Sequence, residues 1–399
     1  MIAWGDVYKV VAAMAPLYFA LGLGYGSVRW CRLFTPEQCG AINTLVAHFS
    51  MPFFTFDFLA RANPYAMDRR VLAADAASKA LTIAAVACWW WWARCCRCGA
   101  GGAKDAGARS SWCVTGFSLA AFNNTLVVGV PLLDAMYGAW ARDLVVQLAV
   151  VQALVWVPLL LLGFELRKAW VVRNGIASAA AGDGQAAAGG GRVEPAVSSQ
   201  AKKASSPPPA AEKGDVEMNA AAEPDAPPPA GMIRRLWPIV RTVGLKLAGN
   251  PNVYASVLGV VWACIAFRWD LRMPGVVSES LQVMSRTGTG MSMFSMGLFM
   301  AQQEKIVACG AGLAALGMAL RFVAGPLATL AGAAAFGLRS DVMRFAIIQA
   351  ALPQSIASFV FAKEYGLHAD VLSTAVIFGT LVSLPVLIAY YAVLGVVSL

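Results

Sequence analysis

Residues 113–137 read CVTGFSLAAFNNTLVVGVPLLDAMY, an apolar run that is long enough to cross a bilayer but is interrupted at its middle. A helix that spans a hydrocarbon core needs about 20 apolar residues. Asn123 and Asn124 lie side by side in this run, and Gly129 and Pro131 follow within two turns. Adjacent amides in hydrocarbon are unfavourable unless they find partners or line a polar cavity. The sequence therefore predicts a broken membrane helix with a polar centre.

A second interrupted run lies far downstream. Residues 351–358 read ALPQSIAS, again polar and proline-bearing, within the apolar run 342–362. Paired broken helices are typical of secondary transporters, because the N-terminus of each half-helix offers free N–H groups and a positive dipole end to an anion. We therefore expect a small organic anion as the substrate. The alternative is that both interruptions only kink their helices and satisfy each other across the bundle.

Further apolar runs surround these two. The full set is 7–28, 38–60, 70–93, 113–137 and 143–166, followed by 250–267, 275–301, 307–337, 342–362 and 370–397. Hydrophobic residues make up 59% of the chain and charged residues only 13%, about half the charged share of a typical soluble domain. The sequence predicts an all-α integral membrane protein with ten transmembrane helices, of which the fourth and ninth are broken.

A change of composition divides the ten runs into two sets of five. Residues 172–231 are rich in Ala, Gly, Pro and Ser and hold too few large apolar residues to form a core, so we predict a disordered linker there. Residues 1–171 and 232–399 form the two repeats. Because five is an odd number, the second repeat enters the membrane in the opposite sense, as in an inverted repeat.

The net charge of +9 reflects topology rather than nucleic-acid binding, since the basic residues lie in short loops and form no continuous patch. The loops on the linker side carry more Lys and Arg than the opposite loops. By the positive-inside rule the linker is cytosolic, and both termini lie on the other side of the bilayer. The lipid bilayer is therefore an expected partner, and nucleic acid is not.

Charged residues inside the spans are few. Asp75 and Lys79 lie four residues apart, on one face of the third span. Each ion alone would cost about 2.5 to 3.5 kcal/mol at the bilayer centre, so we expect the two to neutralise each other. The pair could hold a fixed charge beside the site, Asp75 could take a proton, or the pair could only hold the bundle together. Arg321, in the eighth span, could snorkel or partner an acid.

Two further polar residues, Gln147 and Gln152, lie in the fifth span and could face the substrate cavity or serve structural hydrogen bonding. The sequence has no catalytic triad, phosphate-binding loop or metal-ligand motif, so we expect no enzymatic activity, cofactor or metal.

Seven short motifs, in the same order, resemble those of the plant PIN-FORMED auxin efflux carriers. They are FTPEQC at 34–39, NPYAM at 63–67, GVPLL at 129–133, MFSMGLFMA at 293–301, ALPQ at 351–354, FAKEY at 361–365 and LSTAVIFG at 372–379. The resemblance covers both helical blocks and leaves only the linker unmatched. It implies a ten-helix carrier of indole-3-acetic acid that works as a homodimer by an elevator-like motion, with spans 1, 2, 6 and 7 as the scaffold.

The resemblance also implies roles for particular residues. Asn124 matches the asparagine expected to meet the auxin carboxylate. The positions that match the indole pocket are Met51, Leu126, Ile356 and Ala357, and we add Gln147 and Ser358 as polar residues of the substrate site. Asp75 and Lys79 match an ion pair that supports the site in place of bound sodium, which favours uniport of the anion.

Two positions depart from the family pattern. Asn123 and Ser358 stand where the family usually has proline, so side-chain amides and hydroxyls are expected to hold the breaks open. The linker is short, which resembles the group associated with the endoplasmic reticulum, and implies movement of auxin from the cytosol into the lumen. A plasma-membrane location, a proton- or sodium-coupled carrier of another organic acid and a non-transporting receptor are the alternatives.

Overall fold

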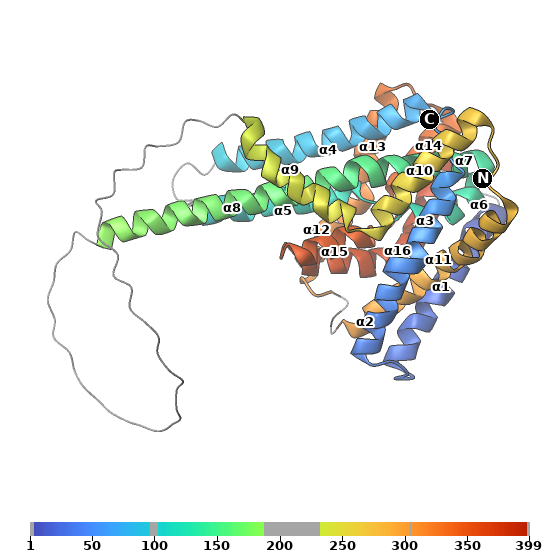
Figure 1. The fold of residues 1–399 in the computed structure, drawn as a ribbon, viewed down its shortest axis with the longest axis horizontal. Helices are drawn as coiled ribbons and strands as arrows, with labels where there is room; N and C mark the ends of the chain where they lie inside the picture. Colours follow the sequence, from blue (N-terminus) through green and yellow to red (C-terminus); the bar gives the residue numbers. More distant parts are fainter. Residues whose placement is uncertain (1–3, 96–102, 187–231, 304, 306, 397–399) are drawn as a thin grey trace, which may run out of the picture.

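The computed structural model is a bundle of α-helices (Figure 1). It describes residues 4–95, 103–186, 232–303, 305 and 307–396. Among these residues no β-strand forms, and one isolated bridge joins two chain segments. Six helical segments of the described chain are long and apolar enough to cross a membrane. The predicted class, an all-α membrane protein, is therefore confirmed.

The helices before residue 187 cover the first five predicted runs. They are α1 (Trp4–Arg29), α2 (Pro36–Leu45), α3 (Met51–Ala60), α4 (Arg69–Cys95), α5 (Ala103–Ala121), α6 (Val130–Tyr137), α7 (Ala139–Val151) and α8 (Val157–Ala186). Helix α8 runs past the predicted linker boundary, so residues 172–186, which we predicted to be disordered, are helical. The rest of the predicted linker, 187–231, lies outside the described residues.

The helices after residue 231 cover the other five runs. They are α9 (Met232–Ala248), α10 (Pro251–Trp269), α11 (Gly275–Gln302), α12 (Ala311–Ala319), α13 (Gly325–Ala335), α14 (Ser340–Ala350), α15 (Ile356–Glu364) and α16 (Ala369–Val396). Helix α9 falls outside every predicted run, because Arg241, Lys246 and other basic residues interrupt its apolar positions. It is a strongly amphipathic helix, apolar along one face only.

Four π-helical turns occur in the described chain, at Val46–Ser50 (η1), Thr125–Gly129 (η2), Gln152–Trp156 (η3) and Leu320–Ala324 (η4). Three of them join two α-helices without a break: η1 joins α2 to α3, η3 joins α7 to α8, and η4 joins α12 to α13. A π turn holds one extra residue, so it rotates the faces of the following helix relative to those of the preceding one. A helical wheel drawn through one of these spans therefore assigns the residues after the π turn to the wrong face.

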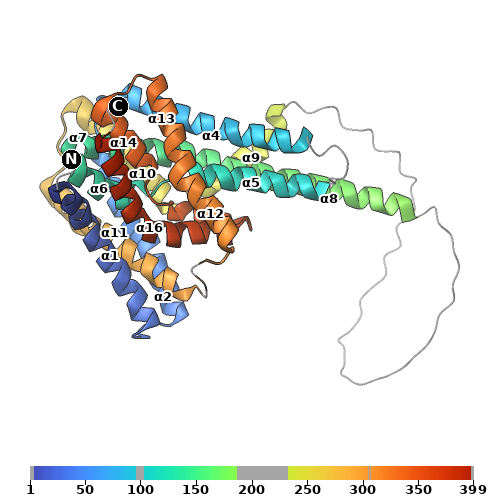
Figure 2. The ribbon, with the colours of Figure 1, turned by 180° about the vertical axis from the view of Figure 1, so that it is seen from behind.

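The helices pack in two groups. In one group α1 lies against α11 so closely that a Cβ atom on Gly24 or on Gly297 would lie 2.1 Å from a backbone oxygen of the facing helix. Helix α3 packs on both α10 and α11. In the other group α13 lies against α4, where a Cβ atom on Gly332 would lie 2.6 Å from the carbonyl oxygen of Ala74. Figures 1 and 2 show α4, α5 and α8 extending together away from α1, α2 and α11.

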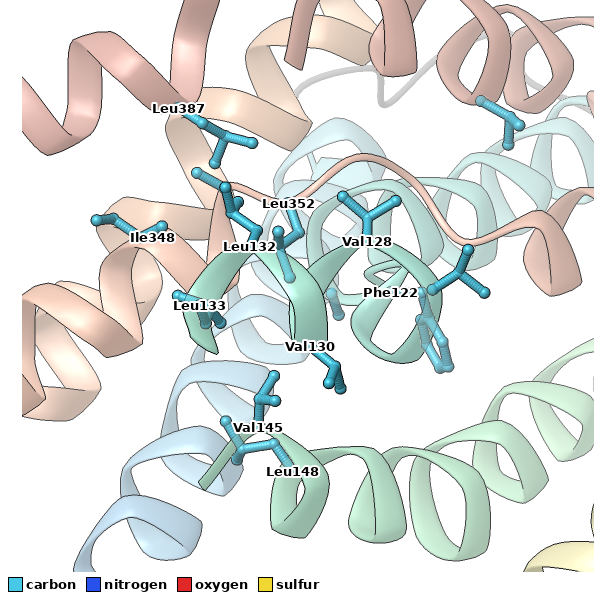
Figure 3. Packing of buried hydrophobic residues seen from close by; sticks show 14 of the residues in the cluster. Phe122, Val128, Val130, Leu132, Leu133, Val145, Leu148, Ile348, Leu352 and Leu387 are labelled. Atoms are coloured by element: carbon cyan, nitrogen blue, oxygen red, sulfur yellow. The ribbon is translucent and has the colours of Figure 1, made fainter. Parts of the chain in front are cut away.

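The apolar core surrounds the interrupted segments. Leu352, in the stretch after α14, lies over η2 and α6, beside Val128 and Leu132 (Figure 3). All three side chains are fully buried. The packing is tight, because a Cβ atom on Gly129 would lie 2.7 Å from the Cδ1 atom of Leu352. The core thus fixes the position of the two chain segments that interrupt the helices.

Candidate functional site

Two non-helical segments, which we call the paired breaks, meet at the centre of the bundle. They are residues 122–124, between α5 and η2, and residues 351–355, between α14 and α15. The N–H group of Asn124 donates to the carbonyl oxygen of Pro353 at 2.9 Å, and the N–H group of Ser355 donates to that of Phe122 at 3.1 Å. The two segments therefore run antiparallel, as two rungs of a sheet ladder would.

Arg321 stabilises the helix ends that enter the paired breaks. Its guanidinium group is fully buried and donates to Leu352 and Ala350, both at 2.7 Å, at the end of α14. It also donates to Leu119 and Phe122, both at 3.2 Å, at the end of α5. The last four carbonyl groups of a helix lack helical partners and carry partial negative charge. One guanidinium thus satisfies the C-terminal ends of two helices.

Arg321 does neither of the two things that the sequence suggested, which were to snorkel to the membrane surface or to pair with an acidic residue. The side chain is 0% exposed, so it does not snorkel to a membrane surface, and no carboxylate of the described chain lies within ion-pairing distance. Its partners are backbone carbonyl oxygens, which sequence patterns do not reveal. An arginine in the middle of an apolar run was the one available signal.

The helix ends that leave the paired breaks are uncapped. Asn124 precedes η2 and Ser355 precedes α15, and neither side chain accepts a hydrogen bond from the helix that follows it. The first N–H groups of each helix thus have no partner in that helix and form a positive end. The side chain of Asn124 makes no hydrogen bond to any described residue and is 9% exposed. These groups could together bind an anion.

Side-chain amides hold the first break in place. Asn123 donates from Nδ2 to the carbonyl oxygen of Gln349, and its own carbonyl oxygen accepts from Nε2 of Gln152 at 2.9 Å. Gln349 in turn donates to the hydroxyl of Thr125 at 3.2 Å. The oxygen Oε1 of Gln349 is buried without a partner among the described residues. In agreement with the sequence-based expectation, side-chain hydrogen bonds hold the backbone at Asn123.

The second break has a similar arrangement. Ser358 donates to the carbonyl oxygen of Ser355 at 2.6 Å and accepts from Nε2 of Gln354 at 2.6 Å. Gln354 also donates to the carbonyl oxygen of Ser118 at 3.0 Å, which ties this break to α5. Ser358 is 1% exposed. Its hydroxyl therefore serves the backbone of the break and is not free to contact a substrate in this conformation.

The predicted ion pair lies next to the first break. Nζ of Lys79 and Oδ2 of Asp75 are 2.8 Å apart, and Nε1 of Trp156 donates to the same carboxylate oxygen at 3.2 Å. A cavity of about 30 Å³ lies between this pair and the side chains of Asn123 and Gln349. That volume has room for a water molecule with polar partners on two sides. The ion pair is thus positioned to influence the site electrostatically.

The structure distributes the other predicted site residues between two regions. Leu126 is half-buried in η2, and Ile356 and Ala357 lie in the first turn of α15, so all three adjoin the uncapped helix ends. Met51 lies on the other helix group, where its sulfur accepts from the hydroxyl of Ser292 on α11. Gln147 lies away from the breaks, since its Oε1 accepts from the N–H group of Asp68 at the start of α4.

Comparison with known proteins places the chain among membrane carriers. A family model described as membrane transport protein matches residues 9–391. The chain is 72% identical to the probable auxin efflux carrier component 5c of Oryza sativa subsp. japonica, over 100% of both chains. It is 48% identical to auxin efflux carrier component 5 of Arabidopsis thaliana, over 99% of both.

The similarity extends to more distant members. The chain is 37% identical to auxin efflux carrier component 8 of Arabidopsis thaliana over 99% of this chain and 100% of that one. These matches span the two helical blocks, the paired breaks and the Asp75–Lys79 pair, so they confirm the resemblance carried by the seven sequence motifs. The chain belongs to the auxin efflux carrier family of membrane transport proteins, and it is a transporter rather than an enzyme.

Proposed function

We propose that this protein carries the anion of indole-3-acetic acid across a membrane. The observation that carries the proposal is the pair of uncapped helix ends beside Asn124. A carboxylate at this position would accept hydrogen bonds from the free N–H groups and from the Asn124 amide, in the field of two positive helix ends. The names of the relatives, auxin efflux carriers, support the choice of anion.

The indole ring would lie against an apolar wall. Leu126, Ile356 and Ala357 adjoin the helix ends, and their side chains offer no hydrogen-bond donors. Met51, on the facing helix group, would complete the wall when the groups approach each other, since its flexible thioether adapts to an aromatic ring. Gln147 and Ser358 would take part only in a conformation in which they leave their present hydrogen bonds.

The topology that we propose is ten spans in two inverted repeats of five. Each repeat would place its broken helix fourth, with α5, η2 and α6 in the first and α14 and α15 in the second. The antiparallel contact between the breaks supports this reading, because two segments that enter a bilayer in opposite senses meet antiparallel.

Transport would follow an elevator-like movement. The group of α1, α2, α3, α10 and α11 would stay fixed as the scaffold, and the remaining spans would carry the site past it. The close glycine contact between α1 and α11 supports a rigid scaffold, since neither helix can move without losing its tight packing. Lys79 supports uniport, because its ammonium group already occupies the position beside Asp75 that a coupling cation would need.

We further propose that the protein acts as a homodimer in the endoplasmic reticulum membrane and moves auxin from the cytosol into the lumen. The short segment between α8 and α9 supports this location. Imaging of a tagged protein against reticulum and plasma-membrane markers tests it, and sharp plasma-membrane labelling would contradict it.

Uptake by purified protein in liposomes tests the transport proposal. We expect radiolabelled indole-3-acetate to enter under a membrane potential alone, at the same rate with and without proton or sodium gradients. Asn124→Ala should abolish most of this uptake. Asn63→Ala removes an amide from the loop between α3 and α4, where Asn63 holds only a turn, and should leave uptake intact. Uptake that requires an ion gradient would favour a coupled carrier, and binding without uptake would favour a receptor.

A further inference from the structure

A second cavity lies away from the paired breaks, between α4, α5 and α8. It has a volume of about 320 Å³, and we call it the lateral groove. Its lining includes Ile83 and Val86 of α4, Cys113 and Phe117 of α5, and Leu160 and Gly163 of α8. Almost all of the lining surface is apolar. A cavity of this kind gives water few hydrogen-bond partners and favours an apolar occupant.

The lateral groove opens sideways rather than toward the ends of the helices. Ile83 and Leu159, which line it from α4 and α8, are 45% and 46% exposed. Both residues belong to segments that are long and apolar enough to cross a membrane. The opening therefore faces the hydrocarbon of the bilayer, and a lipid chain can enter it without crossing water.

A cation, Arg167, lies one turn of α8 beyond the residues that line the lateral groove. Arg167 follows Gly163 by four residues and Leu160 by seven, so it lies on the same face of α8 as these two lining residues. It is nearer than they are to the end of α8 that leads into residues 187–231. In Figures 1 and 2 that end of α8 extends from the outer end of the three-helix group. The apolar groove is thus followed, one turn further along α8, by a positive charge.

The charge of Arg167 is not neutralised within the described chain. Its Nε atom is buried without a hydrogen-bond partner, and no described carboxylate forms an ion pair with it. Glu165, two residues earlier, instead binds Lys246 at 3.0 Å and Tyr365 at 2.6 Å. Burial, and after it the positive charge of Arg167, lower the pKa of His368 in the loop before α16. A buried donor of this kind favours an anionic partner.

We infer that the lateral groove binds an anionic phospholipid, with an acyl chain between α4, α5 and α8 and the phosphate group on Arg167. Guanidinium groups bind phosphate oxygens with paired hydrogen bonds, which would satisfy the buried Nε atom. A free phosphate ion would leave the apolar part of the groove unfilled. The exposed Lys168 beside Arg167 adds a second positive charge at headgroup level. The bound lipid would link α4, which holds Asp75 and Lys79, to α8.

Titration of the purified full chain with phosphatidylserine in detergent tests the inference, with phosphatidylcholine and inorganic phosphate as reference probes. We expect phosphatidylserine to bind more tightly than phosphatidylcholine, and Arg167→Gln to weaken its binding about tenfold. Lys168→Gln, a matched loss of charge on the adjacent exposed residue, should have a smaller effect. Gly163→Leu, which fills the groove but keeps Arg167, should also weaken lipid binding.

Equal phosphatidylserine affinity in the wild type and in both groove variants would overturn the inference. Full competition by inorganic phosphate would show a free-anion site instead. Because a variant could misfold, the wild-type chain provides an independent measurement. A phosphatidylserine with a photoreactive diazirine in its acyl chain should label peptides from α4, α5 or α8. Labelling confined to other helices would contradict the proposed position of the chain.

Discussion

The Nε atom of Arg321 lies 2.7 Å from the carbonyl oxygen of Leu352, and the same guanidinium reaches Phe122 in the other break. One side chain from the eighth predicted span therefore holds the ends of α5 and α14 together. Because the N-terminal ends beyond the breaks remain uncapped, the local field is asymmetric: carbonyl groups are neutralised on one side and N–H groups are free on the other. This asymmetry supports the proposal of an anion site.

Replacing Arg321 by Met should lower stability more than any other single charge removal in the bundle. Several buried carbonyl groups lose their partner at about 1 to 3 kcal/mol each, so we expect a loss on the order of 3 kcal/mol or more. Arg321→Lys should restore part of it, since one ammonium cannot reach both helix ends. Thermal unfolding in detergent measures the effect. Arg286→Met, at an exposed arginine of α11, is the control, and equal losses in both variants would contradict this role.

The Asp75–Lys79 pair should show strong coupling in a double-mutant cycle. The chain offers a matched control in Asp57 and Arg61, an ion pair with the same spacing whose arginine is 56% exposed. We expect about 1 to 3 kcal/mol of coupling in the stability of the Asp75→Asn and Lys79→Met variants, and less than about 1 kcal/mol for the control pair. Transport should fall with either change at the buried pair. Comparable coupling in both pairs would show that burial near the break is irrelevant.

Replacing each of the two glutamines of the fifth predicted span in turn should show which of them contributes to transport. Gln152→Leu removes the donor to the carbonyl oxygen of Asn123, so we expect transport to fall about tenfold or more. Gln147→Leu removes only an acceptor for the N–H group of Asp68, and should lower stability with a smaller effect on transport. Uptake assays corrected for the amount of folded protein measure the difference. A larger transport defect in Gln147→Leu would instead support the assignment of Gln147 to the substrate site.

The sequence predicted the breaks and the local contribution of Asn123 and Ser358, but not the distant side chains that also hold the breaks. The breaks are visible in the sequence because amides and proline are unfavourable in a regular helix within an apolar run. The residues that carry this signal are Asn123, Asn124 and Pro353. The partners of Arg321 and Gln152 come from distant segments, and no local pattern encodes such contacts. Residues five apart point in different directions on a regular helix, so Gln147 and Gln152 do not share a face, and the sequence alone does not indicate which of them reaches the break.

The cluster in which Lys246 of α9 contacts Glu165 of α8 and Glu364 and Tyr365 at the end of α15 should respond to alkaline pH. Burial, and then the hydrogen bond to Glu165, raise the pKa of Tyr365 to about 12. Burial opposes the charge of Lys246, but hydrogen bonds to Glu364, Tyr365 and Glu165 outweigh it and raise its pKa. Both groups bind protons more tightly in the folded state. Their stabilisation is therefore complete below about pH 10 and declines as the pH rises above it.

Thermal unfolding of the wild type and Tyr365→Phe across pH 7 to 12 tests this dependence. The difference in stability between the two should be constant from pH 7 to about pH 9 and should shrink above about pH 10. Tyr65→Phe removes an exposed phenol that donates to the carbonyl oxygen of Cys264, so it serves as the control. If the stability difference between the wild type and Tyr365→Phe grows as the pH rises, the result contradicts a raised pKa of Tyr365.

The central claim is that Asn124 and the free helix ends recognise a carboxylate. Equilibrium binding of radiolabelled indole-3-acetate and of its neutral amide, indole-3-acetamide, to purified wild-type and Asn124→Ala protein tests it most directly. We predict that the wild type prefers the anion and that Asn124→Ala weakens anion binding about 10- to 100-fold while changing amide binding little. Equal affinity of the wild type for both compounds, or unchanged anion binding in Asn124→Ala, would contradict the claim.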